Sequence, residues 1–232
     1  MRWRGCGRGV VAVAALALAA CGGDDGGGTP VTGIYTPLAP GSAELAPDDL
    51  AGETFFDHPW PSDFRRRDDG TPVIRGFPNP RMVPLVTVYV DTLDDGLVDG
   101  FSTVAGGYLR FDAALDPASL PTERDSLRAD AAVQLIDVDP ASPTYLARTP
   151  IRTHFRGAGG IYVSPTTLRW VPSFGYPLRP ATRYALVVTD AVKSGDGGPA
   201  SAAPALAEIV GTSPHPSSEA AAAAAALADD VA

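Results

Sequence analysis

The sequence has little cysteine, lysine or charge. Its 232 residues include only 2 cysteines, a single lysine (Lys193) and 19% charged residues. With 45% apolar residues, so low a charge content argues against a wholly disordered chain and against a coiled coil. The 27 acidic residues outnumber the 18 basic ones and give a formal charge of -9. That balance excludes a surface built to bind nucleic acid.

Long apolar runs and long helices are also scarce. The 25 glycines and 23 prolines disfavour uninterrupted helices. One apolar run, residues 10–20, follows Arg2, Arg4 and Arg8 with no acidic residue before it. Because this run is too short to span a bilayer as a helix, residues 1–20 are predicted to be an export signal.

The end of the predicted signal indicates lipid attachment. Leu18-Ala19-Ala20-Cys21 resembles the lipobox of bacterial lipoproteins, which implies that Cys21 is acylated and becomes the mature N-terminus. The alternative is an ordinary signal peptide with a chance cysteine. Gly22 stands where an Asp would retain a Gram-negative lipoprotein in the inner membrane, so the outer membrane is favoured. We therefore expect an exported protein whose partner is the membrane, reached through an N-terminal lipid.

Removal of the signal changes the charge and the cysteine count. It takes away three arginines, which leaves 15 basic against 27 acidic residues and a formal charge of -12. Cys6 leaves with the signal and Cys21 carries lipid, so no disulfide is expected. Stability must then come from an apolar core. Residues 21–28, rich in Gly and Asp, are predicted to be a flexible tether.

Residues 29–99 are predicted to be a proline-rich strap that lies over the core. Apolar spacing within residues 82–95 favours one helix in it, with Asp95-Gly96 as a stop. The run Arg65-Arg66-Arg67 is predicted to be a solvated turn that pairs with the acidic residues after it. Four aromatic residues are expected to anchor the strap, or alternatively to form an exposed patch that grips a ligand: Phe55, Phe56, Trp60 and Phe64.

Residues 100–198 show β character. Short apolar segments bounded by turn residues predict strands at 108–111, 132–138, 151–155, 161–163, 168–171 and 184–189. Without long helices between them, a two-sheet antiparallel sandwich is the expected solution, giving a mainly β fold. Residues 199–232 are predicted to be a helical, alanine-rich tail with little to bury, and we expect the natural chain to continue beyond Ala232.

A resemblance covers roughly residues 57–198. Its motifs are Leu115-Asp116-Pro117-Ala118-Ser119-Leu120, Trp170-Val171-Pro172 and Pro177-Leu178-Arg179-Pro180-Ala181-Thr182-Arg183-Tyr184. This stretch resembles the bacterial Ig-like domain of the S-layer (SbsA) type. With the upstream Pro59-Trp60-Pro61-Ser62-Asp63 it is similar to the N-terminal region of exported virulence-factor-type bacterial lipases and related lipoproteins. The resemblance implies an Ig-like β-sandwich.

The residues of the best motif point to structural roles. Pro180 sets a turn, Thr182 can bond the local backbone, and Tyr184 can enter a strand with its hydroxyl bonded back to that turn. Trp170 is expected in the core rather than as a ligand platform. Asp116 and Pro117 belong to the same structural motif.

Catalytic chemistry has little support in the sequence. There is no G-x-S-x-G nucleophile elbow, and none of His58, His154 and His215 has the setting of a triad base. No loop that would cradle phosphate is present, so no cofactor is expected, and the histidine and cysteine spacing excludes zinc. The cluster Asp91, Asp94, Asp95 and Asp99 is interpreted as solvated turn residues, with a calcium site as the less favoured alternative, because the spacing does not fit an EF-hand.

Two functions follow as expectations. The first is a lipid-anchored envelope lipoprotein with a non-catalytic Ig-like module for scaffolding, adhesion or presentation. The second is the N-terminal accessory region of a surface lipase or esterase whose α/β-hydrolase domain lies beyond Ala232. The chain as it stands is not expected to be an enzyme.

Overall fold

The computed structural model describes residues 11–12, 27–36, 50–67, 69–204 and 206. Cys21, most of the predicted signal and tether, and the alanine-rich part of the predicted tail lie outside the described residues. Within the described ranges, no helix is long and apolar enough to cross a membrane.

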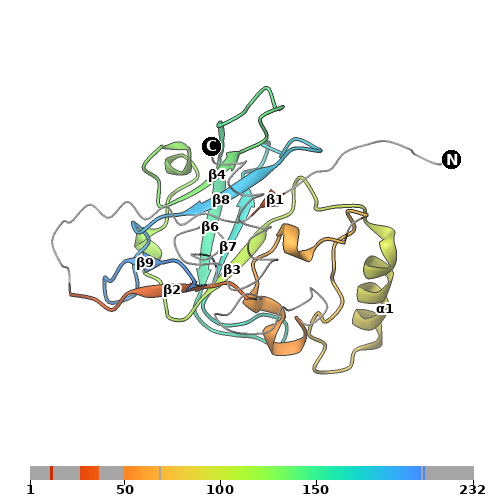
Figure 1. Ribbon diagram of the computed structural model, residues 1–232. Helices are drawn as coiled ribbons and strands as arrows, with labels where there is room; N and C mark the ends of the chain where they lie inside the picture. The colour runs from red at the N-terminus through yellow and green to blue at the C-terminus, as the bar shows by residue number, and fades with distance from the viewer. Residues whose placement is uncertain (1–10, 13–26, 37–49, 68, 205, 207–232) are drawn as a thin grey trace.

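Two β-sheets dominate the molecule (Figure 1). The larger sheet has the strand order β6 (Ile151–Arg156), β7 (Thr167–Pro172), β3 (Gly107–Phe111), β2 (Val31–Ile34) and β9 (Ala200–Ser201). The second sheet contains β8 (Tyr184–Val188), β4 (Val133–Asp137) and β5 (Arg148–Thr149), with β1 (Val11–Ala12) beside β8. Because β1 lies inside the predicted export signal, an exported chain would keep the three-stranded part of this sheet.

Alternation along the strands explains why the sheets pack on a common core. Leu135 of β4 is opposite Leu186 of β8, and the two side chains are buried. Phe111 of β3 and Leu168 of β7 are fully buried in the same cluster, although they come from the other sheet. The apolar sides of both sheets therefore enclose one core, as in a sandwich, and the fold is mainly β.

Most predicted strands are confirmed, with three differences. Residues 161–163 form a tight turn with a single bridge between Gly160 and Val163, not a strand. Pairing is mainly antiparallel as expected, but β2 runs parallel to β9 and β1 parallel to β8. In addition, β2 lies within the predicted strap and β9 within the predicted helical tail, so residues on both sides of 100–198 complete the large sheet.

The strap is fastened at its aromatic residues, which confirms their role as anchors. Phe55 and Phe56, in a 3-10 helix at Gly52–Asp57, are buried. Trp60 forms an isolated bridge with Tyr108 of β3, and its ring contacts Phe101 edge-on, with the centroids 4.9 Å apart. A side chain at Gly107 would collide with the Trp60 carbonyl, so this close approach requires glycine. A second 3-10 helix, Asp63–Arg65, follows.

The predicted helix within the strap is confirmed as α1 (Pro84–Thr92), and it continues into a π-helical turn, Leu93–Leu97, that contains Gly96. Pro84 occupies the first helical turn, where its missing N–H costs nothing. No residue of α1 is buried. The helix lies at one edge of the molecule, at the opposite end from β2 and β9 (Figure 1).

Candidate functional site

A groove separates the strap from the loop between β6 and β7. It encloses about 620 Å³ and is lined by Gly52, Glu53, Phe56, residues 78–80, Arg110, residues 159–161 and residues 163–165. Beside it, the rings of Phe77 and Tyr162 stack at 10° with their centroids 6.4 Å apart, which joins the strap to the loop. The lining is mainly apolar with few polar groups, a composition typical of a binding cleft.

Among the described residues, the groove is lined by one cation, Arg110, and one carboxylate, Glu53, and the guanidinium of Arg110 is already paired. It lies on β3 and contacts the carboxylate of Asp57 in the strap. Burial raises the pKa of Asp57 above its ordinary value, although Arg110 acts in the opposite direction. Because Asp57 takes up the positive charge, the groove offers shape and apolar contact rather than a free cation.

A buried, hydrogen-bonded Ser–His pair lies within the strap, and sequence reasoning missed it. Nε2 of His58 is 2.6 Å from Oγ of Ser62, and Nδ1 of His58 contacts the Thr36 carbonyl oxygen. The ring thus has a serine on one side and an orienting oxygen on the other, which is the arrangement of a nucleophile and its base. However, His58 is 0% and Ser62 2% exposed, so substrate has no access to the pair.

Arg65 is buried, which corrects the predicted solvated turn at Arg65-Arg66-Arg67. Its side chain is 1% exposed, and its guanidinium donates to the Phe55 carbonyl and lies 4.2 Å from the centroid of the Phe55 ring. Carbonyl oxygens and an aromatic face replace the acidic partner that the sequence predicted. Within the part of the chain that the structure describes, Arg66 pairs locally with Asp63 at 3.1 Å, whereas Arg67 pairs with the distant Asp94.

The aspartates considered for calcium do not form a metal site. Among the described residues, no three His, Cys, Asp or Glu side chains form a group that could hold a metal ion. Asp94 is instead a buried hub: Arg67 approaches it to 2.7 Å and Arg75 to 3.2 Å. Burial opposes ionisation of Asp94, but the amides of Arg75 and Ile74 and the Arg67 guanidinium hold its pKa below the ordinary value. Asp91, Asp95 and Asp99 are exposed.

The remaining predicted residues take the structural roles expected of them. The Tyr184 hydroxyl accepts a hydrogen bond from the Arg179 amide at 3.0 Å, and the Thr182 hydroxyl donates to the Pro180 carbonyl. Asp116 caps the 3-10 helix Pro117–Ser119 by accepting from the Ala118 amide at 2.9 Å. Trp170 is 2% exposed in the core.

Two apolar features face solvent. The first, the α1 apolar face, consists of Met82, Leu85, Val88 and Tyr89, each at least 60% exposed. The second is the turn from Ser173 to Tyr176 between β7 and β8, in which Phe174 is 99% exposed. Sequence patterning found α1 as a helix but could not reveal that its apolar residues stay uncovered.

The described residues therefore combine an enclosed polar pair, a half-open groove and two exposed apolar features. Comparison of the chain with models of known protein families, with curated proteins and with solved structures finds no match.

Proposed function

We propose that the protein is a lipid-anchored envelope lipoprotein whose non-catalytic, Ig-like β module scaffolds or presents a binding surface. Cys21 would hold it at the membrane, with the outer membrane favoured by Gly22. The sandwich-like packing of two sheets on one core and the Tyr184 corner support the Ig-like assignment.

The exposure of α1 is the observation that carries this proposal. A helix that is apolar on every side is normally buried. Here, Leu85, Val88 and Tyr89 are each about 60% exposed, whereas Val86 and Val90 on the other side of the helix are half-buried. Exposed apolar surface of this kind marks an interaction site. The strap that lies on the module therefore offers an apolar surface to a partner, while the Ser–His pair within the strap is enclosed.

The same helix supports the second function, an accessory region of a surface lipase or esterase. In that case a hydrolase domain encoded beyond Ala232 would cover the α1 apolar face. Reading the coding sequence past this point separates the two proposals. A G-x-S-x-G motif followed by an acidic residue and a His selects the accessory region, and a stop codon or another β module selects the scaffold.

Membrane fractionation tests the anchoring. We expect the wild-type protein in the membrane fraction and Cys21→Ser in the soluble exported fraction, because only Cys21 follows the lipobox-like residues. Cys6→Ser is the matched control and should remain with the membrane, since Cys6 is lost with the signal. A Cys21→Ser protein that stays with the membrane as completely as the wild type after a high-salt wash, which releases electrostatically bound protein, would refute the anchor.

An esterase assay tests the absence of catalysis. The purified chain is expected to show no turnover of short acyl esters, because solvent does not reach Ser62 or His58. Turnover that a serine-reactive phosphonate abolishes, and that Ser62→Ala also abolishes, would show that the pair becomes accessible and that the protein is an enzyme.

A further inference from the structure

Phe174 protrudes from the molecule on a turn that is held from both sides. The Ser173 carbonyl accepts from the Tyr176 amide at 2.9 Å, and Gly175 has the positive φ of 87° that the turn requires. The Ser173 amide donates to the Pro150 carbonyl at 2.8 Å. After the turn, the Leu178 amide donates to the Thr103 carbonyl at the same distance. These bonds fix the backbone of the turn that carries Phe174.

Apolar surface extends beyond this ring. Tyr176 is 59% exposed on the same turn, and Val104, next to Thr103, is 64% exposed. Phe174 leads the group at 99% exposed. We call this group of exposed side chains the aromatic tip. Phe174 at its end is almost wholly exposed, as a side chain that enters a soft medium would be.

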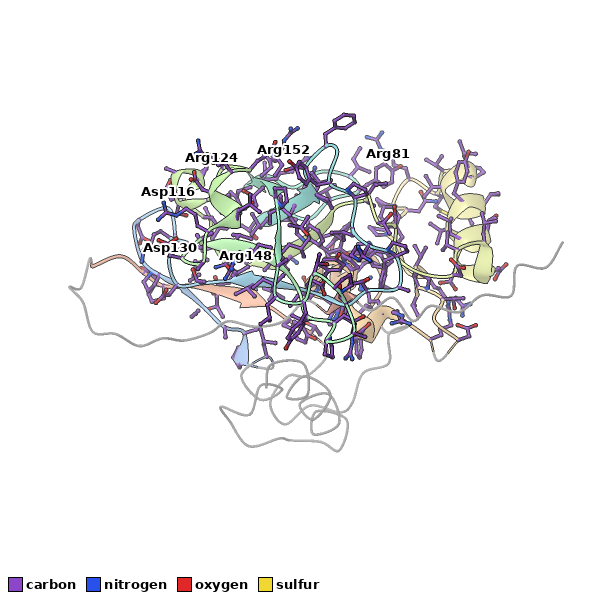
Figure 2. All side chains as sticks on the ribbon, turned by 90° about the horizontal axis from the view of Figure 1, so that it is seen from above. Arg81, Asp116, Arg124, Asp130, Arg148 and Arg152 are labelled. Atoms are coloured by element: carbon purple, nitrogen blue, oxygen red, sulfur yellow. The ribbon has the colours of Figure 1, made fainter. Side chains whose placement is uncertain are left out.

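The surroundings of the aromatic tip are basic, although the chain is acidic. The three segments that hold it, residues 102–105, 148–153 and 173–183, contain four arginines and no acidic residue. Arg152 lies on β6 one position after Ile151, which is opposite Pro172 at the base of the turn. Figure 2 places Arg152, Arg124 and Arg81 along one edge of the molecule. The acidic Glu123 also lies at this place: it pairs with Arg152 at 2.7 Å, and Arg152 and then Ser173 of the turn lower the pKa of its carboxyl. The excess of positive charge in these segments therefore comes from Arg148, Arg179 and Arg183.

We propose that the aromatic tip inserts into the headgroup boundary of a bilayer that contains anionic lipids, and that it orients the domain on the membrane. The Phe174 ring supplies apolar surface, the Tyr176 ring suits this boundary because one end is apolar and the other wet, and arginines beside them attract anionic headgroups. Two rings insert too little surface to hold a protein alone. This inference therefore rests on the proposed lipid anchor, which would supply the local concentration that the tip needs.

A depth measurement tests the insertion. The lipidated protein carrying Phe174→Trp is placed on vesicles of brominated phosphatidylcholine and phosphatidylglycerol, and the wild-type signal of the native tryptophans is subtracted. We expect a blue shift and bromine quenching of the new tryptophan. Tyr89→Trp on α1 is the control, since Tyr89 is another exposed aromatic residue but lies on a different element. It should show neither effect.

A charge measurement makes the test independent of the anchor. The chain carrying Cys21→Ser is added to phosphatidylglycerol-containing vesicles and to pure phosphatidylcholine vesicles. Arg152→Glu should weaken binding to the anionic vesicles by about fivefold or more. Arg128→Glu, whose exposed partner is Asp130, makes the same charge change elsewhere and should alter binding much less.

Three results would overturn the proposal. The first is an anchored protein in which the tryptophan at position 174 is unquenched. The second is equal quenching at positions 174 and 89, because the tip would then not orient the domain. The third is burial of the tryptophan at 174 by self-association or by a protein partner in the absence of vesicles. A failure of the anchor alone appears differently: the Cys21→Ser protein still binds anionic vesicles and still distinguishes Arg152→Glu from Arg128→Glu.

Discussion

The imidazole of His58 lies 2.6 Å from the hydroxyl oxygen of Ser62, and neither side chain reaches solvent. The two residues stand on either side of the bridge that Trp60 makes with Tyr108, so the pair forms part of the attachment of the strap to β3. A buried polar pair is stable only when its hydrogen bonds are satisfied, and the Thr36 carbonyl completes the set for His58. The pair therefore joins Thr36 to residues 58–62 through buried hydrogen bonds.

Acidification should weaken the fold through His58. Burial, and next the nearby Arg65, lower its pKa from 6.5 to about 3. Between these two pH values the unfolded chain binds a proton at this histidine and the folded chain does not. The free energy of unfolding therefore falls as the pH drops, by at most about 1.4 kcal/mol per pH unit. Above about pH 6.5 this residue contributes no pH dependence. Urea unfolding at a series of pH values measures the slope, and His58→Gln should flatten it.

The exposed His154 of β6 provides the control for this slope. His154→Gln makes the same substitution at an exposed position, so comparison of the two variants isolates the effect of burial. If His58→Gln keeps the full wild-type slope, the imidazole is not held neutral by burial, and the enclosed Ser–His pair is contradicted.

Replacing Asp94 should destabilise the strap without any role for calcium. Asp94→Asn removes the charge that pairs with Arg67 and Arg75, and we expect a loss of about 2 kcal/mol, since both arginines are partly exposed and screened. The pKa of Asp94 is lowered in the folded state, so this stabilisation is present above about pH 4 and is lost as the pH falls through the folded pKa. Chemical unfolding of both proteins near neutral pH measures the difference.

The neighbouring Asp95 is exposed, so Asp95→Asn should change the unfolding free energy by less than about 0.5 kcal/mol. Added Ca²⁺ or EDTA should leave the thermal midpoint of the wild type unchanged. A calcium-dependent rise in the midpoint that Asp95→Asn abolishes would restore the metal site.

The hydroxyl of Tyr184 should contribute measurably to stability. Tyr184→Phe leaves the ring in the core but removes the acceptor of the Arg179 amide, which costs about 1 kcal/mol. Differential scanning calorimetry should show a lower midpoint for this variant. Tyr176→Phe is the matched control and should not shift the midpoint, because Tyr176 is exposed. Equal midpoints for all three proteins would mean that the corner bond adds nothing.

Polar substitutions on α1 should spare the fold and remove apolar surface. Leu85→Asn combined with Val88→Asn should reduce the fluorescence of a bound anilinonaphthalene dye, with little change in unfolding free energy. Leu135→Ala in the core should cost about 2–5 kcal/mol. If the α1 variant were as destabilised as the core variant, the helix would be packed and not presented.

Strands with an internal signal were predictable, and strands that depend on distant partners were not. The sequence predicts β4 because apolar and polar residues alternate at its start, and it predicts β8 because this segment is a short continuous apolar run. β9 has two residues and exists because Ala200 pairs with Val31, far away in the sequence. Such a short segment has no periodicity of its own, so only the neighbouring strand defines it.

The candidate site shows the same division. Exposed aromatic residues between prolines and glycines, such as Phe174, could have been singled out as a turn, but their exposure could not be read from the sequence. The groove, the Arg67–Asp94 pair and the enclosure of Ser62 all require segments that meet only after folding.

By itself the sequence determined the features with local causes: the turn from Pro180 to Tyr184, the start of α1 at Pro84 and the alternation in β4. Each depends on residues within a few positions of one another. Only the tertiary structure decided which side chains are buried and which are exposed. Arg65 is enclosed because Phe55 and its carbonyl lie over it, and Phe174 is exposed because its turn is held away from the core. Burial is a property of what surrounds a residue, and distant parts of the chain supply those surroundings.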